Sequence, residues 1–241
     1  MTSHNTRTHL SRLTLRRHAP SVAPLIRDLM PAEPGRAMDV HHRLLWSLFS
    51  GGYEKADGEA AFLWRRMDSG DRFFVLGPEP VQRPDYFDVE SRPFDVTFRK
   101  GQRLAFDLRV NATVDRMIDP ARGRNGRQRC DLVYDAVLKG RRNQEVMTQD
   151  QRDRIISTTL RDWLESQGKT GGFLLKAFTV SHYRTMPLPE GKGGRGAQLG
   201  VADLAGILEV VEPDAFLHRV QRGFGRSKAY GCGLMLLRPA E

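Results

Sequence analysis

The stretch 223–237 reads GFGRSKAYGCGLMLL and combines four glycines, two cations and a final apolar run. Bare backbone lets main-chain N–H groups approach an anion closely, and phosphate is the usual anion. In dinucleotide and P-loop sites a strand runs into the glycines and a helix follows. Here a helical pattern at 212–222 precedes the glycines and a strand pattern at 232–238 follows them, which argues against both classes. The stretch is either a tight helix-to-strand turn or, with Arg226 and Lys228, a cradle for backbone phosphate.

The whole chain of 241 residues is basic, with 38 Lys and Arg against 29 Asp and Glu and a formal net charge of +9. A basic folded protein usually binds a polyanion, nucleic acid first and an anionic membrane surface second. A second basic segment lies within 96–130 and is either a solvated loop or an Arg-rich and Gly-rich segment that becomes ordered on RNA or DNA. Its cations are Arg99, Lys100, Arg103, Arg109, Arg116, Arg122, Arg124, Arg127 and Arg129.

The cysteine content and the lack of long apolar runs indicate the cellular compartment of the protein. The two cysteines, Cys130 and Cys232, support neither a disulfide framework nor a cysteine-based zinc site. No run approaches the roughly 20 apolar residues that a membrane span requires, and the polar N-terminal residues lack the apolar centre of a signal peptide. We therefore expect a cytoplasmic protein without a membrane partner.

The hydrophobic pattern predicts two successive α+β units, at 1–93 and 94–241. Such units are typical of an α+β fold with two tandem ferredoxin-like (RRM-like) domains. The first unit shows no clear second helix. The expected segments are strand 10–15, loop 31–39, helix 40–49, hairpin strands 60–67 and 71–77, linker or edge segment 77–93, strand 103–110, basic loop 115–129, helix 148–168, strand 173–183, flexible connection 187–198, strand 199–211, helix 212–222 and strand 232–238.

Three motifs resemble one known family. The C-terminal run is similar to the pattern G-x-G-x-x-K-x-x-G-x-G-L of CRISPR repeat-processing endoribonucleases of the CasE type, within the RAMP superfamily. VHHRLLWSLF at 40–49 is similar to the first helix of that family, and GQRLAFDLRVNAT at 101–113 to the strand that opens its second domain. The motifs occur in the family's order and span nearly the whole chain. The glycine pattern is met by Gly223, Gly225, Lys228, Gly231, Gly233 and Leu234, and the strand pattern by Arg109 and Asn111.

The resemblance implies a function that composition alone does not show. It implies metal-independent cleavage of precursor CRISPR RNA at the 3′ base of the repeat stem-loop, without a cofactor. It also implies that the enzyme stays on the mature crRNA as a subunit of the type I-E Cascade surveillance complex. The residues expected to bind the RNA are Arg43, Arg99, Lys100, Arg103, Arg109, Asn111, Arg122, Arg124, Arg127, Arg129, Arg222, Gly223, Gly225, Arg226, Lys228, Gly231 and Gly233.

Two adjacent histidines lie in the segment 40–49, and a histidine can deprotonate the 2′-hydroxyl of RNA or protonate the leaving 5′-oxygen. At 100° per residue, the apolar residues of this helix form one wide face. His41 points near the middle of that face, so we expect it to be packed, whereas His42 lies at the edge and can stay open to a cleft. The family's pattern also places the catalytic histidine at His42. Trp46 belongs to the apolar pattern and is expected in the core.

The sequence departs from the family three residues before His42, where members commonly carry a tyrosine that assists catalysis. Asp39 stands there and either caps the helix or holds the imidazole. Tyr53 and Lys55 follow the helix and are candidates to replace the tyrosine, and Lys228 can stabilise the charge of the phosphorane.

Two other classes of function compete with this interpretation. A non-catalytic RNA-binding subunit of the same fold would keep the basic surface and would not use His42. An enzyme acting on a small phosphorylated metabolite would use the glycine stretch alone, but it would leave the second Arg-rich segment unexplained.

Lys192 and Arg195, in the connection 187–198, can also reach an RNA groove.

Overall fold

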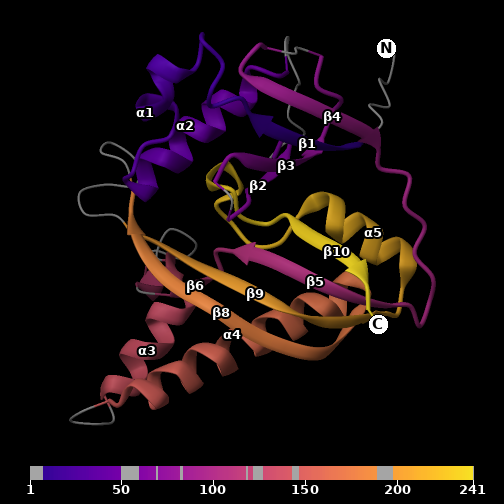
Figure 1. Cartoon of the computed structure of the whole chain (residues 1–241). Coiled ribbons are helices and arrows are strands. Elements are labelled where there is room, and N and C mark those ends of the chain that lie inside the picture. Colours follow the sequence, from indigo (N-terminus) through magenta and orange to yellow (C-terminus); the bar gives the residue numbers. More distant parts are fainter. Residues whose placement is uncertain are drawn as a thin grey trace.

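The computed structural model describes residues 8–49, 60–68, 70–81, 84–117, 119–121, 127–142, 147–188 and 198–240. Two four-stranded antiparallel sheets lie one above the other, and helices pack against each of them (Figure 1). The first sheet belongs to residues 9–93 and the second to residues 103–239. This arrangement confirms the predicted α+β fold of two tandem ferredoxin-like domains.

The N-terminal sheet has the strand order β2-β3-β1-β4. Its four strands are β1 (His9–Leu15), β2 (Leu63–Arg66), β3 (Arg72–Gly77) and β4 (Phe87–Pro93). Strand β3 lies between β1 and β2 and is antiparallel to both, which is the split βαβ unit of a ferredoxin-like fold. The connection from β1 to β2 contains the 3-10 turn η1 (Ala23–Leu25) and the helices α1 (Ile26–Leu29) and α2 (Pro34–Trp46). The described residues between β3 and β4 form no helix, as the sequence suggests.

One expectation for this domain is wrong and another is confirmed. Residues 31–39 were expected as a loop, but α2 begins at Pro34, because the Glu33 carboxylate accepts the N–H groups of Gly35 and Arg36 and proline suits the first helical position. Residues 77–93 are predicted as a linker or edge segment, and the edge alternative is confirmed: their last part forms edge strand β4, paired with β1 along its whole length. Its side chains are mostly charged or exposed, so they show little apolar alternation.

The C-terminal sheet has the strand order β10-β5-β9-β8, the same arrangement as in the first domain. Helices α4 (Gln149–Gly171) and α5 (Pro213–Arg222) provide its two connections, and the short turn η3 (Lys228–Tyr230) lies in the glycine stretch. The strands are β5 (Arg103–Val110), β8 (Phe173–Pro187), β9 (Gln198–Val210) and β10 (Met235–Pro239). The predicted alternation of β5 is confirmed, because its even-numbered residues are buried under the helices.

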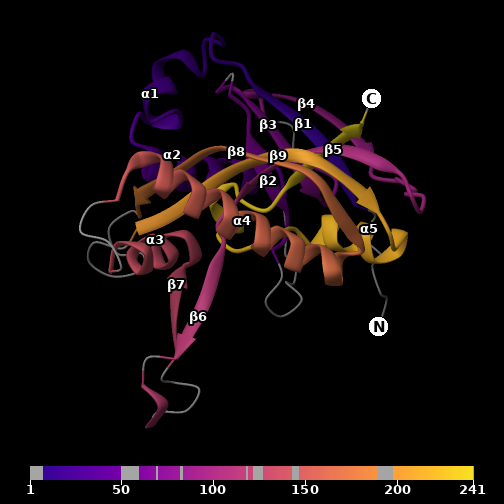
Figure 2. The same cartoon turned by 90° about the horizontal axis from the view of Figure 1, so that it is seen from below.

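The segment 115–129 was expected as a basic loop, but it contributes to a β-hairpin. Strand β6 (Thr113–Met117) pairs with β7 (Arg127–Asp131) in an antiparallel ladder, and Figure 2 shows the pair projecting from the body of the domain. Helix α3 (Leu132–Arg142) follows and was not predicted. Charged side chains occupy both faces of the hairpin, so no apolar alternation marks these strands.

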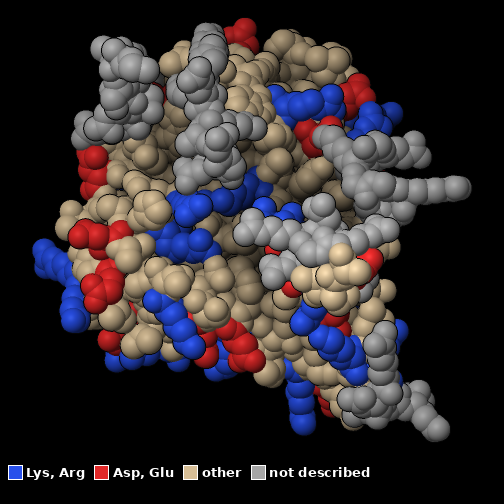
Figure 3. Space-filling model, turned by 180° about the vertical axis from the view of Figure 1, so that it is seen from behind, with Lys and Arg blue, Asp and Glu red and all other residues tan. Residues whose placement is uncertain are grey.

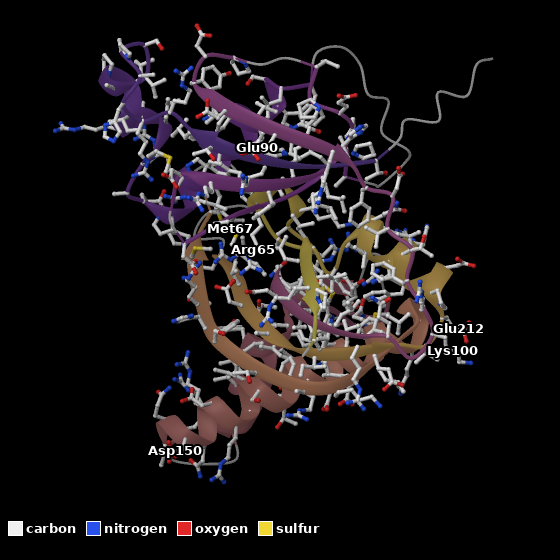
Figure 4. All side chains as sticks on the ribbon, turned by 45° about the vertical axis from the view of Figure 1, so that its right-hand side comes forward. Arg65, Met67, Glu90, Lys100, Asp150 and Glu212 are labelled. Carbon is white, nitrogen blue, oxygen red and sulfur yellow. The ribbon has the colours of Figure 1, made fainter. Side chains whose placement is uncertain are left out.

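Ion pairs as well as apolar contacts join the two domains, and an ion pair within the second sheet lies beside them. Arg65 of β2 donates to Asp107 of β5 at 2.8 Å and lies 4.0 Å from Asp203 of β9. Figure 4 shows Arg65 at the junction between the two sheets. Arg109 makes two hydrogen bonds to Asp203, at 2.7 and 3.1 Å. Burial alone would lower the pKa of Arg109, but its bonds and its attraction to Asp203 raise this pKa above the ordinary value.

His41 is packed in the core of the first domain, as expected, with 1% of its surface exposed. Its ring lies edge-on to Phe73, with centroids 5.2 Å apart. Burial, followed by the nearby charge of Arg66, lowers the pKa of His41 to about 4, although a hydrogen bond with the backbone of Leu29 opposes the shift. His41 is therefore neutral in the folded protein at physiological pH.

This burial predicts a pH-dependent stability. Below pH 6.5 the unfolded chain protonates His41 and the folded chain does not, so folding stability is lost as the pH falls, down to about pH 4. We expect His41 to lower the unfolding free energy by about 3 kcal/mol as the pH falls from 6.5 to about 4. Urea unfolding at pH 7 and pH 5 would show a steeper loss in the wild type than in His41→Phe, whereas His218→Ala, at an exposed site, would match the wild type. Parallel pH profiles for wild type and His41→Phe would contradict the assignment.

Candidate active site

A cavity of about 600 Å³ opens where the two domains meet beside the glycine stretch. Helix α2 contributes His42 and Trp46 to its wall, and residues 60–62 contribute the segment that leads into β2. The other wall comes from the end of α5 and from the stretch that follows it. The lining residues on that wall are Arg219, Arg222, Gly223, Gly225, Arg226, Ser227, Lys228 and Ala229.

His42 is half-buried and faces this cavity, one helical position after the fully packed His41. Its Nε2 accepts a hydrogen bond from Trp46 Nε1 at 3.1 Å. The ring of Phe62 lies beside both, with centroids 5.7 Å from His42 and 5.2 Å from Trp46. Trp46, which the sequence placed in the core, is therefore a half-buried wall residue in contact with His42. The spacing of four residues puts both side chains on one helix face, and this signal was present in the sequence.

The glycine stretch is fixed to the end of β5 by Asn111. The backbone N–H of Arg226 donates to the Asn111 carbonyl at 3.0 Å, and Ser227 Oγ donates to Asn111 Oδ1 at 3.0 Å. The Asn111 amide donates to the Gly200 carbonyl at 2.7 Å, so this buried side chain is satisfied on both sides. Ser227 is the only non-glycine residue with a positive φ, 57°, in the described part of the chain. Asn111 therefore holds the turn that presents Arg226 and Lys228.

The four glycines of the stretch all have positive φ, and their Cβ positions meet protein atoms. A Cβ on Gly223 would lie 2.7 Å from Leu63 of the first domain, and one on Gly231 would lie 3.2 Å from Trp64. A Cβ on Gly225 would lie 2.6 Å from the Asn111 carbonyl, and one on Gly233 would lie 2.8 Å from the Phe224 carbonyl. The glycines thus let the chain turn tightly and pack closely against both domains. The cations, not the glycines, supply the electrostatic attraction for phosphate.

Four cations line the cavity, and none of the described residues that line it is acidic. The guanidinium of Arg219 stacks on Phe224, 4.7 Å from the ring centroid. Burial, followed by the like charge of Arg222, lowers the pKa of Arg219. Lys228 Nζ donates to the Arg222 carbonyl at 2.7 Å, at the C-terminal end of α5. This wall therefore carries a net positive charge, and a bound anion would stabilise the charged forms of its side chains. Figure 3 shows Lys and Arg side chains gathered near the middle of the face opposite to that of Figure 1.

Asp39 and Arg43 lie one turn apart on α2 and form an ion pair at 3.1 Å. Asp39 is the sixth residue of the helix, so the expectation that it caps the helix is wrong, and Glu33 takes that role. Arg43 is largely exposed. Tyr53 and Lys55 lie outside the described residues, so their candidate roles stay predictions.

The other cations predicted to bind RNA fall into three groups. Arg109 is held in the domain junction by Asp203. Arg99, Lys100 and Arg103 lie at the opposite end of β5 from Asn111; Figure 4 shows Lys100 near Glu212, at the start of α5, whereas the cavity lies at the helix end. Arg129 pairs with Asp115 on the projecting hairpin, at 3.2 Å. Arg122, Arg124, Lys192, Arg195 and the side chain of Arg127 lie outside the described residues.

Among the residues that the structure describes, no three or more His, Cys, Asp or Glu side chains are grouped closely enough to hold a metal ion. None of the described helices is long and apolar enough to cross a membrane.

Comparisons with known proteins agree with this fold. Cse3 from Thermus thermophilus, bound to an RNA representing a pre-cleavage complex, is 25% identical, with a TM-score of 0.63 over 97% of this chain and 100% of that chain. Cas6e from Escherichia coli K-12 is 18% identical, with a TM-score of 0.58 over 96% and 100% of the two chains. A chain of a CRISPR RNA-guided surveillance complex, pre-nicking, is 19% identical, with a TM-score of 0.60 over 96% and 100%. A comparison with curated proteins gives no match.

The fold and these structural relatives place the chain among proteins with two tandem ferredoxin-like domains. The family model described as CRISPR associated protein matches residues 8–239. The chain belongs to this family, which confirms the resemblance seen in the three motifs.

The close packing of the glycine stretch predicts that one added methyl group strongly lowers the unfolding free energy. Gly225→Ala places a Cβ 2.6 Å from the Asn111 carbonyl at φ +65°, so we expect a loss of roughly 2–5 kcal/mol in unfolding free energy. Gly101→Ala is the matched control, because Gly101 has φ +81° and open space around it, and only the strain of about 1–2 kcal/mol applies. Denaturant unfolding would measure the unfolding free energy of both variants and of the wild type. Equal losses in the two variants would contradict the close approach at Asn111.

Proposed function

We propose that this protein is an endoribonuclease that cleaves precursor CRISPR RNA at the 3′ base of the repeat stem-loop. It acts by attack of the RNA 2′-hydroxyl without a metal ion. It then stays on the mature crRNA as a subunit of the type I-E Cascade complex. Membership of the CRISPR-associated family and the likeness to RNA-bound Cse3 support the substrate class. The resemblance of the three motifs to the CasE type supports the subunit role.

The observation that carries this proposal is the shared cavity. One wall presents the imidazole of His42, and the opposite wall presents four cations with no acidic lining residue among those described. A phosphodiester bound to the cations would lie within the same cavity as the imidazole. Arg222 and Arg226 are suited to hold phosphate oxygens, and Arg219 gains a counter-charge when phosphate binds.

The reaction needs one proton removed and one supplied. His42 takes the proton of the 2′-hydroxyl, O2′ forms a bond to phosphorus, and the bond from phosphorus to O5′ breaks. O5′ takes a proton from water or from Lys228, which also stabilises the extra charge of the phosphorane. The products are a 2′,3′-cyclic phosphate and a 5′-hydroxyl. Asp39 acts through its ion pair with Arg43, which holds the cation that directly follows His42 in the chain.

A non-catalytic RNA-binding subunit is the second candidate. The observation in its favour is Asp39, which occupies the family's tyrosine position and pairs with Arg43. In that case the cavity would hold RNA without cutting it.

A cleavage assay separates the two candidates. The substrate is a labelled repeat-hairpin RNA from a type I-E array of the source organism, incubated in EDTA under single-turnover conditions. We expect a single cut at the 3′ base of the stem by the wild type, and a rate lower by about 10²- to 10⁴-fold in His42→Ala with RNA affinity retained.

Two controls sharpen the assay. His218→Ala removes an exposed imidazole that does not line the cavity and should cleave like the wild type. A substrate with a 2′-deoxyribose before the scissile phosphate should bind and remain uncut. Tight binding without cleavage by the wild type would support the non-catalytic candidate, and cleavage of the deoxy substrate would exclude 2′-hydroxyl attack.

A further inference from the structure

Trp46 makes a specific polar contact with His42, in addition to packing. Its indole N–H donates to His42 Nε2 at 3.1 Å, and the two rings are nearly perpendicular, with centroids 6.2 Å apart. Phe62 packs edge-on against the indole, with centroids 5.2 Å apart, and supports it from the segment before β2. All three side chains line the same cavity.

This contact fixes the protonation state of the imidazole. An indole nitrogen is a donor only, so Nε2 of His42 must accept and carries no proton. The neutral ring then has its proton on Nδ1. An imidazolium has a proton on both nitrogens and cannot accept the indole N–H. The hydrogen bond therefore favours the neutral imidazole over the charged form.

We propose that Trp46 is a positioning residue that holds His42 as a neutral base in the Nδ1–H tautomer until RNA binds. The attacking 2′-hydroxyl replaces the indole N–H at Nε2 and donates its proton there during cleavage. The indole thus keeps the basic lone pair on Nε2. This inference rests on the proposed function, because it assigns His42 the role of the base.

Charged groups surround this imidazole on two sides. The cations of the opposite wall disfavour an imidazolium, as the indole does, whereas the carboxylate of Asp39 on α2 favours it. Apart from the buried His41, the described titratable groups within one turn of His42 on α2 or in the lining of its cavity are Asp39, Arg43, Arg219, Arg222, Arg226 and Lys228. Trp46→Phe leaves all of these charges in place, so the effect of the N–H can be separated from theirs.

The direct test reads the tautomer in the RNA-free full chain. Protein labelled with ¹⁵N-histidine is examined by long-range ¹H–¹⁵N correlation NMR near neutral pH, with His42→Ala used to assign the signals. We expect an unprotonated Nε2 and a protonated Nδ1 in the wild type, and a shift toward the Nε2–H tautomer in Trp46→Phe. Trp163→Phe, a change on α4 away from the cavity, should match the wild type. A protonated Nε2 in the wild type, or identical tautomers in wild type and Trp46→Phe, would overturn the proposal.

A kinetic test uses single-turnover cleavage across pH at subsaturating protein concentration, so that the pH profile of the second-order rate constant reports the RNA-free protein. Because Trp46→Phe loses the bond that favours neutral imidazole, the midpoint at which the rate rises should move upward by about 0.4–1 pH unit. RNA affinity should stay within about twofold of the wild type, and Trp163→Phe should keep the wild-type midpoint. An unchanged midpoint in Trp46→Phe contradicts the proposal. The wild-type tautomer decides the proposal even if Trp46→Phe fails to fold, and an inactive wild type would count against the proposed function alone.

Discussion

The bridge between Asn111 and Arg226 is the constraint on which the candidate active site depends. It fixes the glycine stretch to the end of β5, and the buried Asn111 amide links the same point to Gly200 on β9. From there the chain passes close enough to the first domain for Gly231 to lie against Trp64. A bulkier residue at these points would push the stretch away from α2. The cations and His42 share one cavity only because both contacts are kept.

The basic residues of this protein are divided between two tasks. Buried Arg65 pairs with Asp107 of the second domain, and half-buried Arg109 pairs with Asp203 of the neighbouring strand, so both charges are balanced by carboxylates at the domain junction. The cations that line the cavity have no acidic residue among the described lining residues, and burial beside a like charge lowers the pKa of Arg219. An excess of positive charge there is the expected state of a site awaiting a polyanion. Net charge alone does not reveal this division.

The sequence predicted the fold well where apolar residues alternate or recur with the helical period, as in β5 and α4. It missed the β6–β7 hairpin and left β4 as either a linker or an edge segment, because the exposed positions of these strands carry charges that mask the alternation. At the site, helical geometry separated the packed His41 from His42. The sequence shows where cations occur but not how the fold arranges them: Arg109 lies at the domain junction, and Lys100 lies at the far end of the domain from the cavity. Their positions depend on strand pairing across nearly a hundred residues, such as Arg109 with Asp203.

The most direct test of the shared cavity is the salt dependence of binding to the repeat-hairpin RNA. Each phosphate contact by a cation adds about one to the slope of log affinity against log salt. Arg226→Ala should therefore weaken binding and reduce the slope by about one. Lys100→Ala, which removes the same charge at the far end of the domain, should leave the slope unchanged. An unchanged slope in Arg226→Ala together with a reduced slope in Lys100→Ala would contradict the account.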